Sequence, residues 1–254
     1  MTKQKLQKIL GATLCGMLLA MPSARADSSP PGGAEIAADA GWSFKLTPSY
    51  YNTTHEKEAA DINLRANNGP HAVWLGYYRR GNEFEQTRTG YEYTAQYSIV
   101  QVVPSLQLAS HGFAGGSLNT RIGDQVYALL GYGRTNAKDY YNLNFDPNDS
   151  FVFGLGSRLL PKSDLSLFTV RDNRLHTGQQ VTHFVWRWTP GSGERWTLDL
   201  SAKHGRPSPD ESAVSGDAIS LTYDHKAVFI RLAYDRKVNF SNDDQTRLSL
   251  GLRF

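Results

Sequence analysis

The chain ends in Asp244-Gln-Thr-Arg-Leu-Ser-Leu-Gly-Leu-Arg-Phe254, and this segment identifies the kind of sheet that the protein forms. Its side chains alternate between apolar and polar, which is the period of a β-strand. The apolar set comprises Leu248, Leu250, Leu252 and Phe254, and the polar set comprises Arg247, Ser249, Gly251 and Arg253. A strand with one oily face, one polar face and an aromatic end suits the wall of a membrane β-barrel, where lipid meets one face and a wet bore meets the other.

The first residues predict export. Lys3, Lys5 and Lys8 precede an apolar run of about a dozen residues, 9–20, which is too short to span a bilayer. Ala24-Arg25-Ala26 then provides small residues in the pattern of a cleavage site. We therefore expect residues 1–26 to be a cleaved signal peptide, 27–40 a flexible periplasmic segment rich in small residues and proline, and 41–254 a single barrel domain.

Cleavage would change the chemistry of the chain. The segment 1–26 holds four of the 27 basic residues, none of the 24 acidic ones, and the only cysteine, Cys15. The remaining chain has 23 basic and 24 acidic residues, so its charge gives no reason to expect a nucleic-acid partner. It also has no thiol for a disulfide or a thiolate metal site.

After residue 26 no stretch is apolar for long enough to be a transmembrane helix. A membrane protein built from strands must be closed, because hydrocarbon does not tolerate an open sheet edge. The alternative is a soluble β-sandwich, which has the same alternation. Arginines recurring on the polar face and aromatics near the strand ends favour an all-β, single antiparallel transmembrane barrel of 12–14 strands.

Turn residues divide the chain into alternating segments, and short and long connections alternate between them. The longer connections, expected outside the cell, are Thr135–Ser150, Asp172–Gln180, Gly205–Gly216 and Asn239–Asp244. The expected strands are Trp42–Tyr51, Ala60–Asn67, His71–Arg80, Gln86–Tyr97, Ile99–Ala109, Ser117–Ile122, Gln125–Arg134, Phe151–Leu160, Leu165–Arg171, Thr182–Trp188, Trp196–His204, Ala218–Tyr223, Val228–Tyr234 and the closing strand.

The inner face is predicted to be rich in cations. Acidic residues expected there are fewer, namely Asp61, Glu92, Asp199 and Asp235. The basic ones are Lys45, Arg65, Arg88, Arg121, Arg158, Arg187, Lys203, Arg231, Arg247 and Arg253. Basic rings in a confined aqueous bore favour anions. The alternative is a network of internal ion pairs that fills the lumen.

Support for catalysis or for a metal is thin. Ser110-His111 precedes a glycine-rich stretch, 112–116, and Ser117 on the next strand is the one hydroxyl that could reach His111 as a rim hydrolase would require. Asp139, Asp146, Asn148 and Asp149 resemble a calcium cluster, but the same residues are a plain turn signal, which we favour. We therefore predict no catalytic residue, no metal site and no cofactor.

From the terminal Leu-Arg-Phe, the size and the inward arginines, the chain resembles Gram-negative outer-membrane barrels, in general similar to small monomeric porins of the oligogalacturonate and sialic-acid channel type. It departs from the general trimeric porins in being shorter and in lacking a clear constriction loop. The terminal Phe254 resembles the signal that the barrel-assembly machinery reads. The resemblance implies an outer-membrane location, with lipid and lipopolysaccharide as neighbours.

The prediction is a passive channel for small hydrophilic solutes, with a preference for anions. The alternatives are a hydrolase that modifies lipid or lipopolysaccharide, and a closed structural or adhesive barrel. The residues predicted to line the solute path are Arg65, Arg88, Glu92, Arg158, Arg187, Asp199, Lys203 and Arg231.

Overall fold

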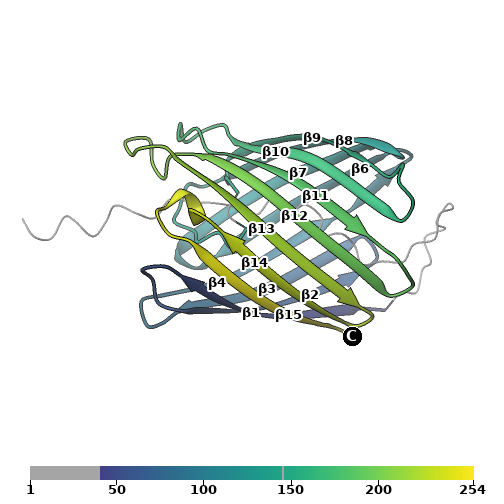
Figure 1. Ribbon diagram of the computed structural model, residues 1–254, viewed down its shortest axis with the longest axis horizontal. Coiled ribbons are helices and arrows are strands. Elements are labelled where there is room, and N and C mark those ends of the chain that lie inside the picture. Colours follow the sequence, from purple (N-terminus) through teal and green to yellow (C-terminus); the bar gives the residue numbers. More distant parts are fainter. Residues whose placement is uncertain (1–40, 145) are drawn as a thin grey trace, which may run out of the picture.

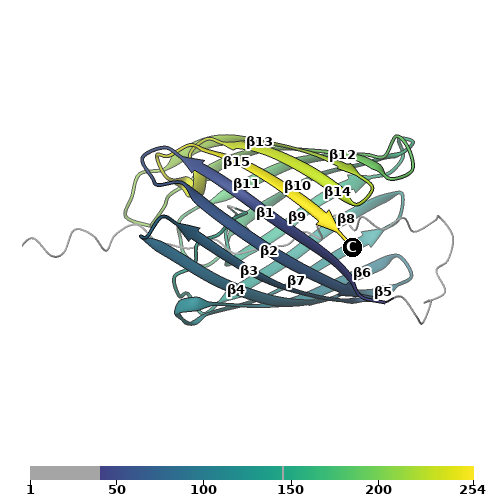
Figure 2. The same ribbon diagram turned by 90° about the horizontal axis from the view of Figure 1, so that it is seen from below.

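The computed structural model describes residues 41–144 and 146–254, which form one closed antiparallel barrel (Figures 1 and 2). The predicted signal peptide and the predicted periplasmic segment lie outside the described residues. The strands are β1 (Ser43–Thr53), β2 (Ala59–Asn68), β3 (His71–Arg80), β4 (Phe84–Tyr93), β5 (Ala95–Tyr97), β6 (Val100–Ala109), β7 (Phe113–Gly123), β8 (Val126–Thr135), β9 (Ser150–Ser157), β10 (Ser163–Asp172), β11 (Gln180–Trp188), β12 (Glu194–Gly205), β13 (Val214–His225), β14 (Val228–Asp235) and β15 (Gln245–Arg253).

The wall is a ring of fourteen strands. β4 and β5 are separated only by Thr94 and both pair with β6, so together they form one wall strand. The ring closes where β1 pairs with β15, with Leu46 opposite Leu252 and Ser49 opposite Ser249 (Figure 2). This closure pairs the backbone groups that an open edge would expose. The predicted fold class and the upper predicted strand number are confirmed.

Side chains alternate between the bore and the outer surface, as predicted. On β15, Leu248, Leu250 and Leu252 are exposed on the outer face, whereas Gln245 and Ser249 are buried inside. Phe254 lies on the outer face, where its ring stacks on that of Phe44 at 5.6 Å between centroids. Its backbone N–H donates to the Phe44 carbonyl at 3.0 Å, so pairing continues to the last residue. The outer face is therefore an apolar surface suited to lipid.

The two ends of the barrel differ in their connections. At one end the strands are joined by tight turns, such as 69–70, 124–125 and 226–227. The other end, called here the long-loop end, carries the connections 136–149, 173–179, 206–213 and 236–244. The last of these includes the short 3-10 helix η2 (Val238–Phe240). In the part of the chain that the structure describes, no helix is long and apolar enough to cross a membrane.

One predicted loop is part of a strand. The sequence predicts a connection over the glycine-rich stretch 112–116 before Ser117, but β7 begins at Phe113. The connection is only the 3-10 turn η1 (Ser110–Gly112). Inward Gly115 and outward Gly116 pair with β6 in regular register, because a strand tolerates glycine when both neighbouring strands supply hydrogen bonds.

The outward register of β14 can be tested with Leu232, which is 55% exposed on the outer face near the middle of its strand. Replacing it by arginine should lower the free energy of unfolding in lipid vesicles by about 2–4 kcal/mol, because the charge would enter hydrocarbon. Ser220→Arg, on the inner face of β13, is the matched control and should cost much less. Equal costs in a urea titration would contradict the assigned faces.

Candidate functional site: the bore and its inserted loop

The charged residues predicted for the lumen lie on the inner face. Four of the residues discussed above make two ion pairs: Arg88 Nη2 lies 2.7 Å from Asp61 Oδ1, and Arg65 contacts Glu92. Lys203 contacts Asp235, and Arg158 Nε lies 3.0 Å from Asp164 Oδ2. The predicted path residues Arg65, Arg88, Glu92, Arg158 and Lys203 are thus engaged in internal pairs, as the ion-pair alternative requires.

The Arg88 pair spans a neighbouring strand. Arg88 is on β4 and Asp61 on β2, with β3 between them. The arginine crosses β3 over Gly76, where an added Cβ would lie 2.8 Å from the guanidinium carbon. Both charged side chains are about 5% exposed. The absence of a side chain at Gly76 is therefore what allows this buried pair to form.

The remaining predicted path residues are not part of such Arg/Lys–carboxylate pairs. Arg187 and Arg231 have no carboxylate partner within hydrogen-bond distance among the described residues; Arg231 Nε donates to the Thr222 hydroxyl at 3.0 Å. Asp199 Oδ1 lies 3.0 Å from His183 Nδ1, and its side chain is 35% exposed. These three residues keep charge available to the bore. Arg247 joins them, because its Nη1 donates to the Leu143 carbonyl rather than to an acid.

The insert 136–149 is not an external loop, and the expectation that the chain lacks a constriction loop is wrong. The insert folds into the bore, where Tyr140, Asn142 and Leu143 are buried. Tyr140 stacks on Phe113 of β7 at 4.3 Å, and Tyr141 stacks on Tyr78 of β3 at 4.8 Å. These aromatic residues remove apolar surface from water inside the barrel.

Polar contacts attach this inserted loop to the wall on either side of the bore. Gln86 of β4 binds the backbone of Tyr141 twice: its Nε2 donates to the carbonyl at 3.0 Å, and its Oε1 accepts the N–H at 2.9 Å. On the other side, Asp146 Oδ1 lies 3.0 Å from His183 Nε2 of β11. In a ring of fourteen strands, β11 is diametrically opposite β3. The loop therefore contacts strands on opposite sides of the bore.

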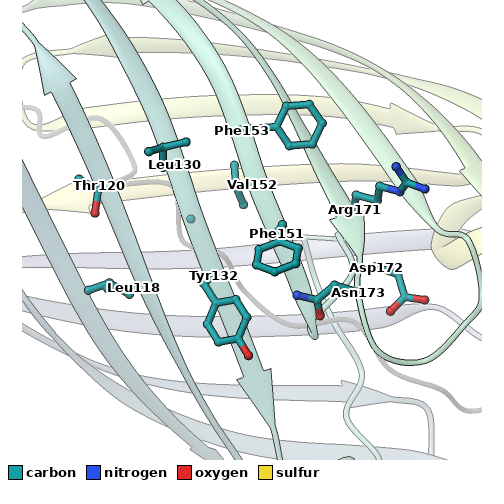
Figure 3. A pocket seen from close by; sticks show the side chains of 11 residues that line it. Leu118, Thr120, Leu130, Tyr132, Phe151, Val152, Phe153, Arg171, Asp172 and Asn173 are labelled. Atoms are coloured by element: carbon teal, nitrogen blue, oxygen red, sulfur yellow. The ribbon is translucent and has the colours of Figure 1, made fainter.

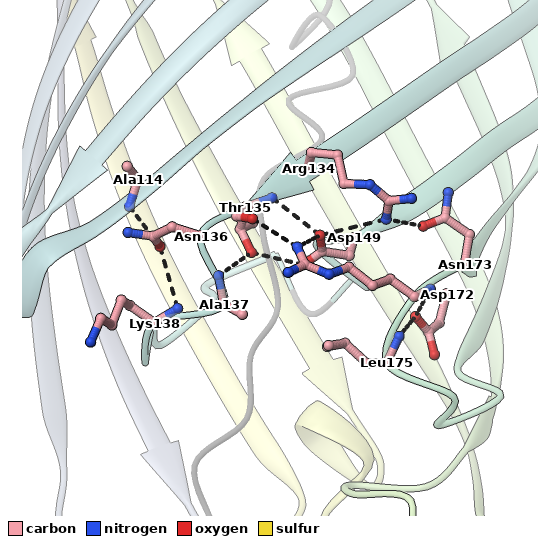
Figure 4. A network of polar contacts seen from close by, with 11 residues as sticks. Ala114, Arg134, Thr135, Asn136, Ala137, Lys138, Asp149, Asp172, Asn173 and Leu175 are labelled. Carbon is pink, nitrogen blue, oxygen red and sulfur yellow. Dashed lines mark hydrogen bonds and ion pairs between the residues drawn. The ribbon is translucent and has the colours of Figure 1, made fainter.

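The base of the inserted loop is fixed by a buried carboxylate (Figure 4). Asp149 accepts hydrogen bonds from the Thr135 N–H at 3.1 Å and its hydroxyl at 2.7 Å, and its Oδ1 lies 3.0 Å from Arg174 Nη1. Asn136 accepts from the Ala114 N–H at 3.1 Å. These bonds join the ends of β8 and β9 and thereby fix the two ends of the loop at the barrel wall.

Two acidic residues of the candidate calcium cluster are engaged by protein groups. Asp146 binds His183, and Asp149 binds Thr135 and Arg174. Within residues 41–144 and 146–254, no group of three or more His, Cys, Asp or Glu side chains is placed to hold a metal ion. Asp146 and Asp149 hold the loop in place, whereas Asp139 is exposed.

On the inner face of β12, β13 and β14 lies a group of small, partly exposed side chains, called here the lane. Asp199, Ser220, Ala233 and Arg247 are direct cross-strand neighbours in one row. Ser201, Ala218, Ser220 and Ala233 are small, and all are partly exposed, whereas Tyr78, Gln86 and Arg88 on the opposite wall are buried. With strands about 4.8 Å apart, Asp199 and Arg247 are separated by roughly 14 Å. The lane thus has an acid on one side and bases on the other.

Basic side chains lie close together at the end of the barrel where tight turns join the strands, called here the short-turn mouth. Arg253, Lys45 and Arg65 are direct neighbours in one row across β15, β1 and β2. Lys45 Nζ and the Arg253 guanidinium lie 5.9 and 5.0 Å from the ring centre of Phe229. A favourable contact with the ring face partly compensates each cation for lost water. Asp224 contacts both Arg253 and Arg195, so one carboxylate is shared by two bases.

The facing side of this mouth is built in the same way. Arg121 and Arg158 lie 5.6 and 5.3 Å from the ring centre of Tyr127, whose hydroxyl donates to Asp164. Sequence reasoning did not single out Arg195, Asp164 or Asp224, although each continues the alternation of its strand into a turn. Lys45, Arg121 and Arg187 have no carboxylate within ion-pair distance among the described residues. The mouth therefore carries an excess of positive charge.

The Ser/His pair considered as the alternative does not form. Ser117 faces the bore on β7, where its hydroxyl lies 2.7 Å from the Ser105 hydroxyl. His111 lies in the turn η1, exposed, with φ of 65°. The Ser105–Ser117 pair is four residues below the pair Ala109–Phe113 that flanks the turn. At about 3.3 Å per residue this is roughly 13 Å, well beyond hydrogen-bond reach.

No protein-family model and no curated protein matches this chain. The solved structures do. Outer membrane protein Omp33 of Acinetobacter baumannii aligns over 84% of this chain and 98% of its own, with a TM-score of 0.54 and 11% identity. A mutant of the porin of Rh. blastica aligns over 84% of this chain and 100% of its own, with a TM-score of 0.50 and 9% identity. The KdgM porin aligns over 83% of this chain and 99% of its own, with a TM-score of 0.48 and 8% identity.

The chain thus has the fold of the outer-membrane porins, and the resemblance predicted from its sequence is confirmed at that level. Within that class it is a fourteen-stranded barrel whose bore contains a folded loop. At these identities the likeness is one of fold.

The attachment of the inserted loop can be tested through Gln86. Gln86→Ala removes two hydrogen bonds to Tyr141, each worth about 0.5–1.5 kcal/mol net. Amide hydrogen exchange at Tyr141 should then accelerate on the order of ten-fold or more. Gln107→Ala is the control, since Gln107 is equally buried inside and no hydrogen bond joins it to the loop among the described contacts. Unchanged exchange in the Gln86 variant would contradict the attachment.

Proposed function

We propose that this protein is a passive channel of the bacterial outer membrane for small hydrophilic solutes, and that it favours anions. The observation that carries the proposal is the imbalance of charge along the bore. Lys45, Arg121, Arg187, Arg231 and Arg247 have no carboxylate within ion-pair distance among the described residues. Two partly exposed inward acids are both engaged: Asp199 by His183, and Asp164 by Arg158.

The proposed path begins at the long-loop end and passes between the inserted loop and the lane on β12, β13 and β14. The small side chains of Ser201, Ala218 and Ser220 leave room there. A solute in the lane would pass between Asp199 and the guanidinium groups of Arg231 and Arg247. Opposite charges facing each other across a narrow aqueous passage orient polar solutes, and low-dielectric walls strengthen the field.

The path then widens into the basic mouth at the short-turn end. An anion leaving the lane meets Arg187 and Lys45, whose positive charge is not cancelled by a neighbouring acid. Arginine binds carboxylates with two parallel hydrogen bonds, so acidic sugars and organic acids are the substrate class that this surface fits best.

The test is single-channel recording of the refolded protein in a planar bilayer with a salt gradient. The expected result is a steady conductance whose reversal potential shows anion preference. Arg231→Ala and Arg187→Ala should each lower the anion-to-cation permeability ratio by about two-fold, because each removes an uncompensated charge from the bore. Arg171→Ala, which removes an arginine from the outer face of β10, should leave the ratio unchanged.

If the unaltered protein shows no conductance, a loop-replacement variant distinguishes a barrel closed by its loop from a preparation that failed to insert. Replacing residues 137–148 by a short Gly-Ser linker should raise the conductance, because it removes the inserted loop while keeping Asp149. If the unaltered protein is silent while this variant conducts, the barrel is closed by its loop and the channel proposal fails. Cation preference in the unaltered protein would contradict the proposed selectivity.

A further inference from the structure

A groove on the outer surface of the barrel is separate from the bore (Figure 3). It has a volume of about 690 Å³ and is lined mainly by outward side chains of β7, β8 and β9. Its apolar walls are formed by Leu118, Leu130, Tyr132, Phe151 and Phe153. Thr120 is shorter than these neighbours and lies among them, which leaves the surface hollow between taller side chains.

The groove lies toward the long-loop end. Tyr132 is three residues before the end of β8, and Phe151 is the second residue of β9. Beyond them, Arg171, Asp172 and Asn173 from the end of β10 complete the lining. The hollow therefore combines a hydrocarbon-like floor with a polar edge at the rim of the barrel.

That edge carries three arginines. The Arg134 guanidinium lies 5.0 Å from the ring centre of Tyr132, and its Nη1 donates to the Asn173 side chain at 2.6 Å. Arg174 Nη1 donates to the Thr135 carbonyl at 2.8 Å and to Asp149 at 3.0 Å. Arg171 is exposed on the outer face, and no acidic partner lies within ion-pair distance of it among the described residues. The contacts above hold Arg134 and Arg174 beside the polar edge of the groove, and Arg171 lines that edge.

The two acids nearby are already engaged. Asp149 is fully buried, bound to Thr135 and Arg174, and its Oδ1 lies 3.6 Å from Arg134 Nη1, so two arginines share one carboxylate. Asp172 accepts the backbone N–H groups of Arg174, Leu175 and Thr177, each at 2.9 Å. Hydrogen bonds from several N–H groups stabilise the charged form of that carboxylate and turn it toward its own loop. Three arginines (Arg134, Arg171 and Arg174) stand against two carboxylates (Asp149 and Asp172), so this end of the groove has a net charge of +1.

The rest of the rim is mixed in charge: exposed Arg79 of β3 binds Gly81 and Asn82 rather than an acid, while several carboxylates lie on the same face. Elsewhere on the outer face, Tyr77 donates to Glu85 at 2.9 Å, Tyr234 donates to Asp244 at 3.0 Å, and Arg236 is paired with Asp217 at 2.8 Å. An incoming phosphate would meet these carboxylates and be repelled. Among the described residues, the β8–β10 sector therefore combines an apolar groove with a surplus of arginine.

We propose that this groove binds lipopolysaccharide from the outer leaflet, with an acyl chain of lipid A in the hollow and a lipid A phosphate on Arg171 and Arg134. The proposal rests on the outer-membrane location proposed above. Arginine forms paired hydrogen bonds with phosphate oxygens. A glycolipid that carries both several acyl chains and phosphates fits the floor and the edge together.

The experiment is native mass spectrometry of the refolded barrel with defined lipids. Diphosphorylated lipid A should bind, and dephosphorylated lipid A should bind at least ten-fold more weakly, because the phosphate contacts are lost. Arg171→Ala and Arg134→Ala should reduce binding by a similar factor, whereas Arg171→Lys should retain part of it. Thr120→Trp should weaken binding by filling the groove.

Arg236→Ala, on the paired part of the rim, is the matched control and should leave binding unchanged. Equal losses in that variant, or equal affinity for phosphatidylglycerol, would mean a non-specific anionic lipid layer and would overturn the proposal. Each variant is checked for its heat-dependent unfolding, so that a folding defect is recognised. Conductance recorded on the same variants separates the two proposals: a silent barrel that still shows the lipid A pattern would defeat only the channel.

Discussion

The structure depends on the closure of its backbone between the first and last strands. In hydrocarbon an unpaired N–H or C=O costs several kcal/mol, so a sheet there is stable only as a complete ring. The pairing of β1 with β15 completes it, and the pairing continues through Phe44 and Phe254. Once the ring is closed, alternation places one half of the side chains against lipid and the other half inside. The interior is then where charge and function are concentrated.

Inside the ring, the inserted loop divides the bore into unlike halves. Toward β3 and β4 it is tightly packed, with Tyr141 against Tyr78 and Gln86 holding the backbone. Toward β12–β14 the middle of the wall carries Ser201, Ala218, Ser220 and Ala233, which remain partly exposed. Buried pairs such as Arg88–Asp61 neutralise charge on the packed side, while Arg231 and Arg247 remain beside the lane. The electrostatics of the path thus follow from where the loop lies.

Much of this architecture could be predicted from the sequence, because alternation with period two reports the face of each residue directly. Leu232, Arg231 and Asp235 all lie on the predicted faces. The pattern of a single strand does not show which side chains on different strands contact each other. The pair Arg88–Asp61 depends on Gly76 of the strand between them, a clue visible only once the register is known.

The position of the inserted loop could not be predicted, for a different reason. The residues 135–150 are rich in Asn and Asp, which is also the composition of an exposed turn. Tyr140, Tyr141 and Leu143 in that segment were the available signal, since apolar side chains grouped in a polar connection favour burial. Asp146 and Asp149 resemble a cation site by composition, but their partners, His183 and Arg174, come from other parts of the chain.

A path between the inserted loop and β12–β14 can be tested by cysteine accessibility in a chain from residue 27, which holds no other cysteine. Ser220→Cys lies in the lane, and Ser166→Cys, only 5% exposed on the inner face of β10, is the isosteric control. We expect a negatively charged thiol reagent to modify the first rapidly and lower its conductance, while leaving the second unmodified. Equal reaction at both positions, or modification at Ser220→Cys without any change in conductance, would show that solutes do not take this path.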